Sequence, residues 1–235
     1  MKLLNPVDVQ TVLMNNHSVK KWLKFISNIY EPPLNKNILL LYPCSKVKPY
    51  HSSRSYKILF KTLKKLREAR DKIHVMTVSE PYGLVPEEFY GRNCEWHDWE
   101  NSWYDCPGLF EWWCRKHKQP YSVKVVDKCI EYLASYVAGF FSRVKKKGFY
   151  SRIIAFVRTY SSSLRMRHDH THRRIVERAA ELASVEVEVL PSREFVRYVV
   201  RRYGRLAWDF YGVAHPAAQR HLLKHLRRIL NGDKK

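Results

Sequence analysis

Residues 38–50 read ILLLYPCSKVKPY, and this stretch decides the fold class that the sequence predicts. It opens with four apolar residues, which is typical of a strand buried on both faces of a sheet. A thiol at Cys44, a hydroxyl at Ser45 and the ammonium groups of Lys46 and Lys48 follow directly. Ligands of open α/β sheets bind at the carboxyl ends of the strands. The stretch therefore predicts a buried strand that ends in a functional loop.

Cys44 is the candidate nucleophile of this loop. Ammonium groups beside a thiol favour the thiolate, which is the nucleophilic form, so Lys48 is a candidate for its activation. The alternative is that Cys44 serves only as a small buried hydrophobic residue.

The rest of the chain alternates between short apolar runs and amphipathic segments. Strands are expected at residues 37–43, 75–78, 152–157 and 185–190. Helices are expected within residues 7–30 and at 56–73, 123–144, 171–183 (with Thr171 as the N-cap), 193–203 and 216–230. This alternation predicts an α/β fold, a three-layer sandwich with a mostly parallel central sheet. We expect a helical segment at 1–33, an α/β domain at 34–212 and a basic C-terminal helix at 213–235.

The charge balance predicts a polyanionic partner. The 235 residues include 43 Lys and Arg against 22 Asp and Glu, which gives a net charge of +21 and favours a nucleic acid over a merely solvated surface. An apolar run long enough to span a membrane and a signal peptide are both missing from the sequence, and the five cysteines lack a regular spacing. We therefore expect a cytoplasmic protein with reduced thiols and no membrane association.

Residues 80–111 differ from their surroundings. They hold eight acidic residues and a single Arg, and we expect a long irregular loop there. Glu80, Glu87 and Glu88 follow the second expected strand, where they would bind an incoming amine, act as a general base or form a solvated acidic loop. Gly83 would allow a ligand to approach the backbone closely.

Two groups of arginines are candidates for RNA contacts. Arg165, Arg167, Arg173 and Arg174 surround the run from His168 to His172, and we favour a phosphate-binding loop over a histidine metal site there, because guanidinium groups repel a divalent ion. Arg197 and Arg201 recur at helical spacing on one face of the helix at 193–203, which favours RNA contact over a solvated face.

Two Cys-x-x-His pairs are candidate zinc ligands. They are Cys94 with His97 and Cys114 with His117. Their thiol and imidazole groups suit tetrahedral zinc, but the tryptophans between the pairs indicate apolar packing. We predict no metal and no cofactor.

Three segments resemble one known family, the archaeosine synthases, which modify tRNA and are related to the archaeal tRNA-guanine transglycosylases. Residues 43–56 are similar to its signature Pro-Cys-x-x-x-Lys-Pro-Tyr-x-x-Ser-x-x-His, with Tyr56 at the position of the final His. Residues 78–88 resemble its Ser-Pro-Leu-Gly-Leu-Val-Pro-Arg-Glu-Leu segment, and residues 104–108 resemble its Tyr-Asp-Ile-Pro turn. The resemblance covers roughly residues 38–115.

The resemblance implies a uracil-DNA-glycosylase-like α/β fold and the transfer of free lysine to the nitrile of 7-cyano-7-deazaguanine in tRNA. It implies catalytic roles for Cys44, Lys48, Ser53 and Tyr56. It implies substrate binding by Pro43, Ser45, Tyr50, Ser79, Glu80, Gly83 and Asp105. A partner subunit would supply the transglycosylase-like, radical or PUA-type domains.

Two other functions stay open at this point. The Tyr at position 56 favours a non-catalytic RNA-binding subunit of a modification complex, whereas the retained Cys44 and Lys48 favour an amidinotransferase-type enzyme. A metal-dependent nuclease or a base glycosylase would rest on the histidine run and on fold analogy alone.

Overall fold

A computed structural model of the chain describes residues 2–91, 95, 104, 108–157 and 170–232. It contains a five-stranded sheet with the strand order β3-β2-β1-β4-β5. The strands are β1 (Ile38–Pro43), β2 (Ile73–Ser79), β3 (Gly83–Pro86), β4 (Arg152–Phe156) and β5 (Glu188–Leu190). All pair in parallel except β3, which runs antiparallel to β2 at one edge. The predicted α/β class with a mostly parallel sheet is confirmed.

The sequence of β1 explains its central place. Residues 38–42 are at most 2% exposed, because β2 and β4 flank the strand and helices cover both of its faces. Leu40 pairs with Val75 of β2 and with Ile154 of β4, so the middle of the sheet is aliphatic in three adjacent strands. The apolar run identified in the sequence is the hydrophobic centre of the fold.

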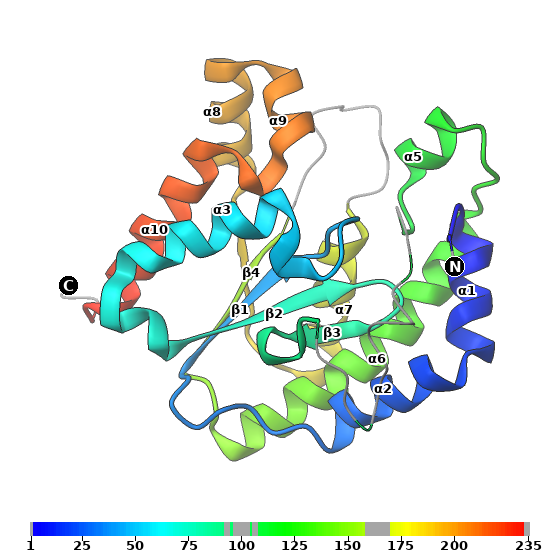
Figure 1. Cartoon of the computed structure of the whole chain (residues 1–235), viewed down its shortest axis with the longest axis horizontal. Helices are drawn as coiled ribbons and strands as arrows, with labels where there is room; N and C mark the ends of the chain where they lie inside the picture. The colour runs from blue at the N-terminus through cyan, green and yellow to red at the C-terminus, as the bar shows by residue number, and fades with distance from the viewer. Residues whose placement is uncertain (1, 92–94, 96–103, 105–107, 158–169, 233–235) are drawn as a thin grey trace.

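Helices cover both faces of the sheet (Figure 1). On one face, α6 (Val123–Lys147) packs against α1 (Pro6–Asn15), α2 (His17–Asn28) and α7 (Thr171–Ala183). On the other face, α10 (Pro216–Leu230) packs against α3 (Arg54–Leu63) and the 3₁₀ segment η2 (Lys64–Lys72). The remaining helical elements are η1 (Tyr50–Ser52), η3 (Glu87–Phe89), α5 (Glu111–Lys116), α8 (Arg193–Tyr203), α9 (Arg205–Tyr211) and η4 (Gly212–Ala214).

Some expected boundaries were wrong. The helix expected at 56–73 ends at Leu63 and continues as η2, where Arg67 adopts a positive φ of 55° that an α-helix does not allow. The last strand begins at Glu188 rather than at residue 185. The segment 80–111 is not wholly irregular, because β3, η3 and the start of α5 lie in it. Thr171 is the first residue of α7 and its N-cap is His170, so the Thr171 hydroxyl is available for another contact.

One hydrophobic cluster runs through the described chain. It includes Leu3 near the N-terminus, the strands, and Leu226 in α10, so it contains residues from all three predicted segments. In the part of the chain that the structure describes, no helix combines the length and apolar character required to cross a bilayer.

The strand order creates a crevice at one end of the sheet. The chain moves from β1 to β2 on one side and later returns to β4 on the other side of β1. The connections that follow β1 and β4 therefore diverge, and such a switch point is the usual ligand site of open α/β sheets. Cys44 follows β1, and α7 begins in the connection that follows β4.

Candidate active site

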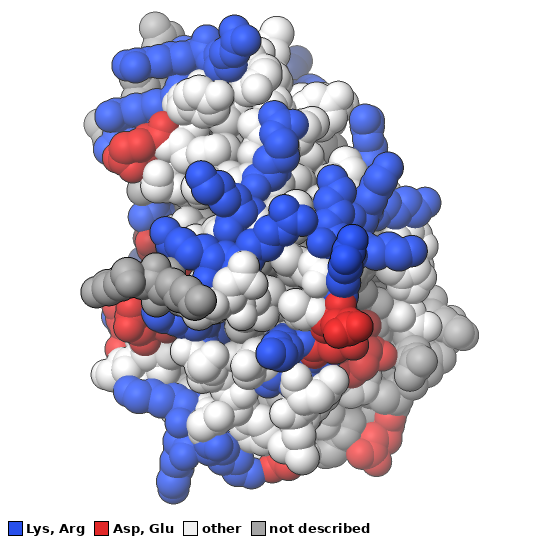
Figure 2. All heavy atoms as spheres, turned by 90° about the vertical axis from the view of Figure 1, so that its left-hand side faces the viewer, with Lys and Arg blue, Asp and Glu red and all other residues white. Residues whose placement is uncertain are grey.

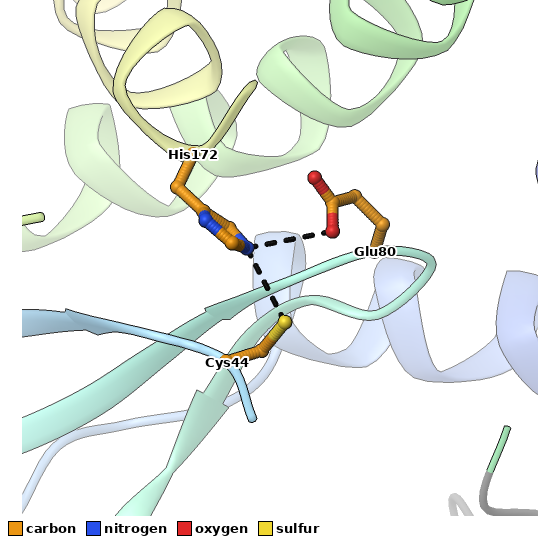
Figure 3. Close-up of side chains that lie close together, drawn as sticks. All are labelled: Cys44, Glu80 and His172. Atoms are coloured by element: carbon orange, nitrogen blue, oxygen red, sulfur yellow. Dashed lines mark hydrogen bonds and ion pairs between the residues drawn. The ribbon is translucent and has the colours of Figure 1, made fainter. Parts of the chain in front are cut away.

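Three side chains from separate elements meet at this crevice (Figure 3). Cys44 follows β1, Glu80 follows β2, and His172 lies in the first turn of α7. The Sγ atom of Cys44 is 3.2 Å from Nε2 of His172, and the same nitrogen is 3.4 Å from Oε2 of Glu80. The backbone N–H of Cys44 donates to the carbonyl of Val78 at 3.0 Å, which holds the loop after β1 against β2. The sheet itself therefore places the thiol beside the imidazole.

Glu80 is enclosed by its neighbours. Its side chain is almost fully buried, and the Thr171 hydroxyl donates a hydrogen bond to Oε1. Gly108 lies against the other oxygen, since a Cβ at that position would stand 2.5 Å from Oε2. Gly108 also has a φ of +73°, which glycine adopts without strain. The carboxylate is thus fixed by the residue that precedes His172 and by the close approach of a glycine.

The electrostatics of the site favour an ion pair between Glu80 and His172. Burial by itself disfavours the imidazolium, but the negative charge of Glu80, and then Cys44, raise the pKa of His172 well above its ordinary value of 6.5. Burial also opposes ionisation of Glu80, yet attraction to His172 and the hydrogen bond from Thr171 lower the pKa of the carboxyl below its ordinary 4.5. The pair is therefore charged at neutral pH.

This arrangement differs from a triad in which the acid binds the far nitrogen of the histidine. Both Cys44 and Glu80 contact Nε2, so a single N–H lies between sulfur and carboxylate. Glu80 stabilises the imidazolium, and that imidazolium is placed to protonate an atom beside the sulfur. The site can thus combine a sulfur nucleophile with an adjacent proton donor.

A pocket of about 200 Å³ opens above the thiol. Its wall is largely aromatic: Phe110, Trp112, Phe210 and Tyr211 line it together with Cys44 and His172. The ring of Phe110 meets His172 nearly edge-on, with centroids 5.5 Å apart. Flat apolar walls around a reactive group suit a planar heteroaromatic ring.

The same three side chains form a possible metal-ligand set. The ligand atoms of Cys44, Glu80 and His172 all lie within 4.8 Å of one another, and thiolate, imidazole and carboxylate together suit zinc. Cys114 and His117, the described members of the predicted Cys-x-x-His pairs, lie elsewhere. Cys114 is buried and donates to the Leu4 carbonyl, and the ring of His117 packs on Trp113 with centroids 3.7 Å apart.

Several residues implied by the resemblance build the floor of the site. Tyr50 donates from its hydroxyl to Ser79 at 2.9 Å, and both are buried. Ser53 caps α3 by accepting from the backbone N–H of Tyr56 at 3.3 Å. The Tyr56 hydroxyl donates to the Pro43 carbonyl at 3.2 Å and also contacts Thr77. These side chains position the strand end that carries Cys44.

The other predicted site residues contact the loop after β1 or α2, or lie outside the described chain. Ser45 accepts from Val47 within the loop, and Nζ of Lys48 lies 5.9 Å from the centre of the Tyr50 ring. Gly83 faces Leu23 of α2 rather than the pocket, with its ideal Cβ position 3.1 Å from Leu23 Cδ2. The predicted residues outside the described chain are Cys94, His97, Asp105, Arg165, Arg167 and His168.

The arginine candidates fall into two groups. Arg173 pairs with Glu177 at 2.8 Å, and Arg174 pairs with Asp127 at 2.7 Å, so both make ion pairs within the protein. Arg197 and Arg201 are exposed on α8, as the helical spacing predicted.

Sequence reasoning did not pair His172 with Cys44. His172 was expected in a phosphate-binding loop, but the described structure places it beside the thiol. The feature of the sequence that could have paired them is their position. Both residues follow strands that were expected to be parallel, and parallel strands end at the same edge of a sheet.

Comparison with known proteins bears on the same part of the chain. Residues 19–115, which contain Cys44 and Glu80, match the family described as a domain of unknown function, DUF5591. Archaeosine synthase subunit alpha from Thermococcus kodakarensis is 38% identical over 72 residues, 30% of this chain and 13% of that protein. This part of the chain is therefore similar to a segment of the archaeosine synthases. Archaeosine synthase from Methanocaldococcus jannaschii is 38% identical over 78 residues, 33% of this chain and 13% of the relative.

The relationship is partial. The matches span only about an eighth of the length of these archaeosine synthases, and His172 lies beyond the residues that match the family. A solved structure, that of AF0587, a protein of unknown function, is a distant likeness with a TM-score of 0.47 and 15% identity over 88% of this chain and 49% of that one.

Proposed function

We propose that this chain is an archaeosine-synthase-like amidinotransferase that adds lysine to the nitrile of 7-cyano-7-deazaguanine in tRNA. The observation that carries the proposal is the 3.2 Å approach of Cys44 Sγ to His172 Nε2 at the base of an aromatic pocket. The relationship to the archaeosine synthases supports the same substrate class. A nitrile carbon is electrophilic, and a thiolate is the strongest nucleophile that the site offers.

The first step forms a thioimidate. Cys44 enters the reaction as a thiolate whose proton is held on Nε2 of His172. Its Sγ bonds to the nitrile carbon, one π bond of the nitrile opens, and the nitrile nitrogen takes that proton from Nε2. The negative charge of Glu80 keeps His172 protonated until the nitrogen needs that proton. The thiol proton has thereby moved to the imide nitrogen, and His172 is left neutral.

The second step releases the product. The ε-amine of lysine bonds to the thioimidate carbon, and neutral His172 accepts a proton from that amine. The carbon–sulfur bond then breaks, and the site returns to its starting state. Nitrile and amine combine to an amidine, and the balance requires neither water nor an energy-rich cofactor.

The pocket supports a base as the reacting group. The part of the pocket beside Phe110 and His172 can hold a 7-deazaguanine ring that has been turned out of the RNA fold, since enzymes that act on a base take it out of the stack. We also infer that the α/β domain is uracil-DNA-glycosylase-like and that a partner subunit or further domain adds contacts to tRNA.

The test is to trap the thioimidate. The purified protein is incubated with tRNA that carries the nitrile base, without lysine, then digested with nuclease and weighed by intact-mass spectrometry. We expect the protein to gain the full mass of the modified nucleotide, because addition to a nitrile expels no group. The adduct should be absent from Cys44→Ala and present in Cys129→Ala, which removes a buried thiol of α6. Lysine should discharge the adduct.

Two outcomes would overturn the proposal. Undiminished lysine transfer by Cys44→Ala would show that Cys44 is not the nucleophile. Binding of tRNA by the wild type without any transfer would favour the non-catalytic RNA-binding subunit. Metal analysis of the same preparation adds a check, because a stoichiometric zinc lost in Cys44→Ala would make the thiol a ligand rather than a nucleophile.

A further inference from the structure

An unusual set of apolar side chains lies exposed beside the pocket. Five large hydrophobic residues between positions 198 and 211 are open to solvent: Tyr198, Tyr203, Leu206, Phe210 and Tyr211. Leu206 and Phe210 are 83% and 76% exposed and lie one turn apart on α9. Side chains of this size are seldom left so open on one short helix without a binding role.

Part of this surface forms the rim of the pocket. Phe210 and Tyr211 line the opening, and their rings are nearly perpendicular with centroids 4.8 Å apart. The guanidinium of Arg54 lies 5.5 Å from the centre of the Tyr211 ring. Trp112, which also lines the pocket, is 41% exposed. The mouth thus presents three aromatic rings and a cation to whatever enters.

The charge around the rim is strongly positive. Five exposed arginines lie on α8 and α9: Arg193, Arg197, Arg201, Arg202 and Arg205. The same helices carry two acidic residues, Glu194 and Asp209. Figure 2 shows that Lys and Arg side chains also gather over the adjoining face formed by α3, α8 and α10. Such a surface complements a polyanion rather than an apolar partner.

We propose that Trp112, Phe210 and Tyr211 form a stacking platform for the unpaired nucleotides that flank the target base in RNA. Unpaired bases stack on aromatic side chains, whereas a closed duplex does not offer their faces. The exposed arginines of α8 would hold the phosphates that lead to the platform. The inference rests on the proposed function in one respect, namely that the pocket receives a nucleobase.

The variants can be matched within one helix. Phe210→Ala removes an exposed ring at the pocket, and Leu206→Ala removes an even more exposed side chain that does not line it. Phe210→Trp restores an aromatic face. Because both residues are largely exposed, we expect all three variants to keep the thermal midpoint of the wild type.

The probe is an unmodified tRNA-arm hairpin that carries 2-aminopurine next to the target position, compared with the same strand in a fully paired duplex. Phe210→Ala should bind the hairpin at least about fivefold more weakly and abolish the quenching of 2-aminopurine. Its affinity for the duplex should not change. Leu206→Ala should bind like the wild type, and Phe210→Trp should restore both binding and quenching.

The contradicting outcomes are distinct. Unchanged hairpin binding and quenching in Phe210→Ala would overturn the platform. Equal losses in Phe210→Ala and Leu206→Ala would also overturn it, because the effect would then not depend on a ring that lines the pocket. The probe carries no nitrile, so this result is independent of Cys44 chemistry. Conversely, a missing thioimidate with a strong Phe210 effect would reject the proposed reaction and retain the platform.

Discussion

The sulfur of Cys44 lies 3.2 Å from Nε2 of His172, although 128 residues separate the two along the chain. Cys44 is the first residue after β1, and His172 lies in the first turn of α7, the helix in the connection that follows β4. Their meeting therefore depends on the pairing of two parallel strands at the centre of the sheet. Glu80, which follows β2, completes the group from the other neighbour of β1.

Cys44 should be the most reactive of the described cysteines. It opens to the pocket, whereas Cys114 and Cys129 are buried, and burial raises the pKa of Cys129 to about 12. We expect iodoacetamide to modify Cys44 at least about tenfold faster than Cys129, as peptide mass spectrometry would show. Lys48→Met should slow this alkylation. Equal rates for the two thiols would argue against a nucleophilic Cys44.

Glu80→Gln should neutralise His172 at neutral pH. Without the carboxylate, the burial that disfavours the imidazolium would dominate, and the pKa of His172 would fall. An NMR titration of the imidazole nitrogens would measure the change. Lysine transfer should fall by about 10²–10⁴-fold, because the proton donor is lost. A His172 that stays charged in the variant would show that Glu80 is not its counter-ion.

The same ion pair predicts how stability depends on pH. The pKa of Glu80 is lowered by folding, so its contribution is present above about pH 4.5 and is lost as the pH falls through the folded value. The pKa of His172 is raised, so its contribution is complete below about pH 6.5 and is lost as the pH rises through the folded value. The stability difference between wild type and Glu80→Gln should therefore be largest between these two pH values in denaturant titrations. A flat difference would contradict the pairing.

Gly108→Ala should displace the Glu80 carboxylate. The new Cβ would stand 2.5 Å from Oε2, at a φ of +73°. Gly148→Ala is the matched control, since its φ is +67° and nothing lies within 4 Å of its Cβ position. Both variants should lose about 1–2 kcal/mol of stability from the left-handed backbone. Only Gly108→Ala should also lose lysine transfer, and equal activity in the two would reject this contact.

Tyr56→Phe should affect stability more than activity. The Tyr56 ring is fully buried, and its hydroxyl bonds to the Pro43 carbonyl and Thr77 rather than to the pocket. Burial also raises the pKa of this phenol well above its ordinary value of 10. We expect a loss of about 1 kcal/mol in denaturant unfolding and lysine transfer within twofold of wild type. A large loss of transfer in a stable variant would make Tyr56 a proton carrier.

Arg197→Glu combined with Arg201→Glu should weaken tRNA binding without unfolding the protein. Both side chains are exposed on α8, so their replacement leaves the core intact. The logarithm of the wild-type affinity for tRNA should fall with the logarithm of the salt concentration, with a slope of about −4 or steeper. The double variant should have a shallower slope. Unchanged affinity and slope would place the tRNA surface elsewhere, with residues 165–174 the next candidate.

Local patterns in the sequence determined much of the sheet and its helices. The apolar run 38–41 marked the central strand, because a strand buried on both faces needs apolar residues throughout. Helical spacing marked α6, α7, α8 and α10. The sequence did not predict the strand β3, because its four residues lie within an acidic, aromatic segment and are too few to show a strand pattern of apolar residues.

The sequence by itself determined that Cys44 directly follows a buried strand and that part of the chain resembles the archaeosine synthases. Only the tertiary structure decided its partners. The spacing of apolar residues indicates which face of a segment packs on the core, but it does not indicate which strands become neighbours in the sheet. The strand order brought Glu80 and His172 to the thiol. It also buried Tyr56 against Pro43 and Thr77, because the helix after β1 folds back over the sheet and turns its apolar face inward.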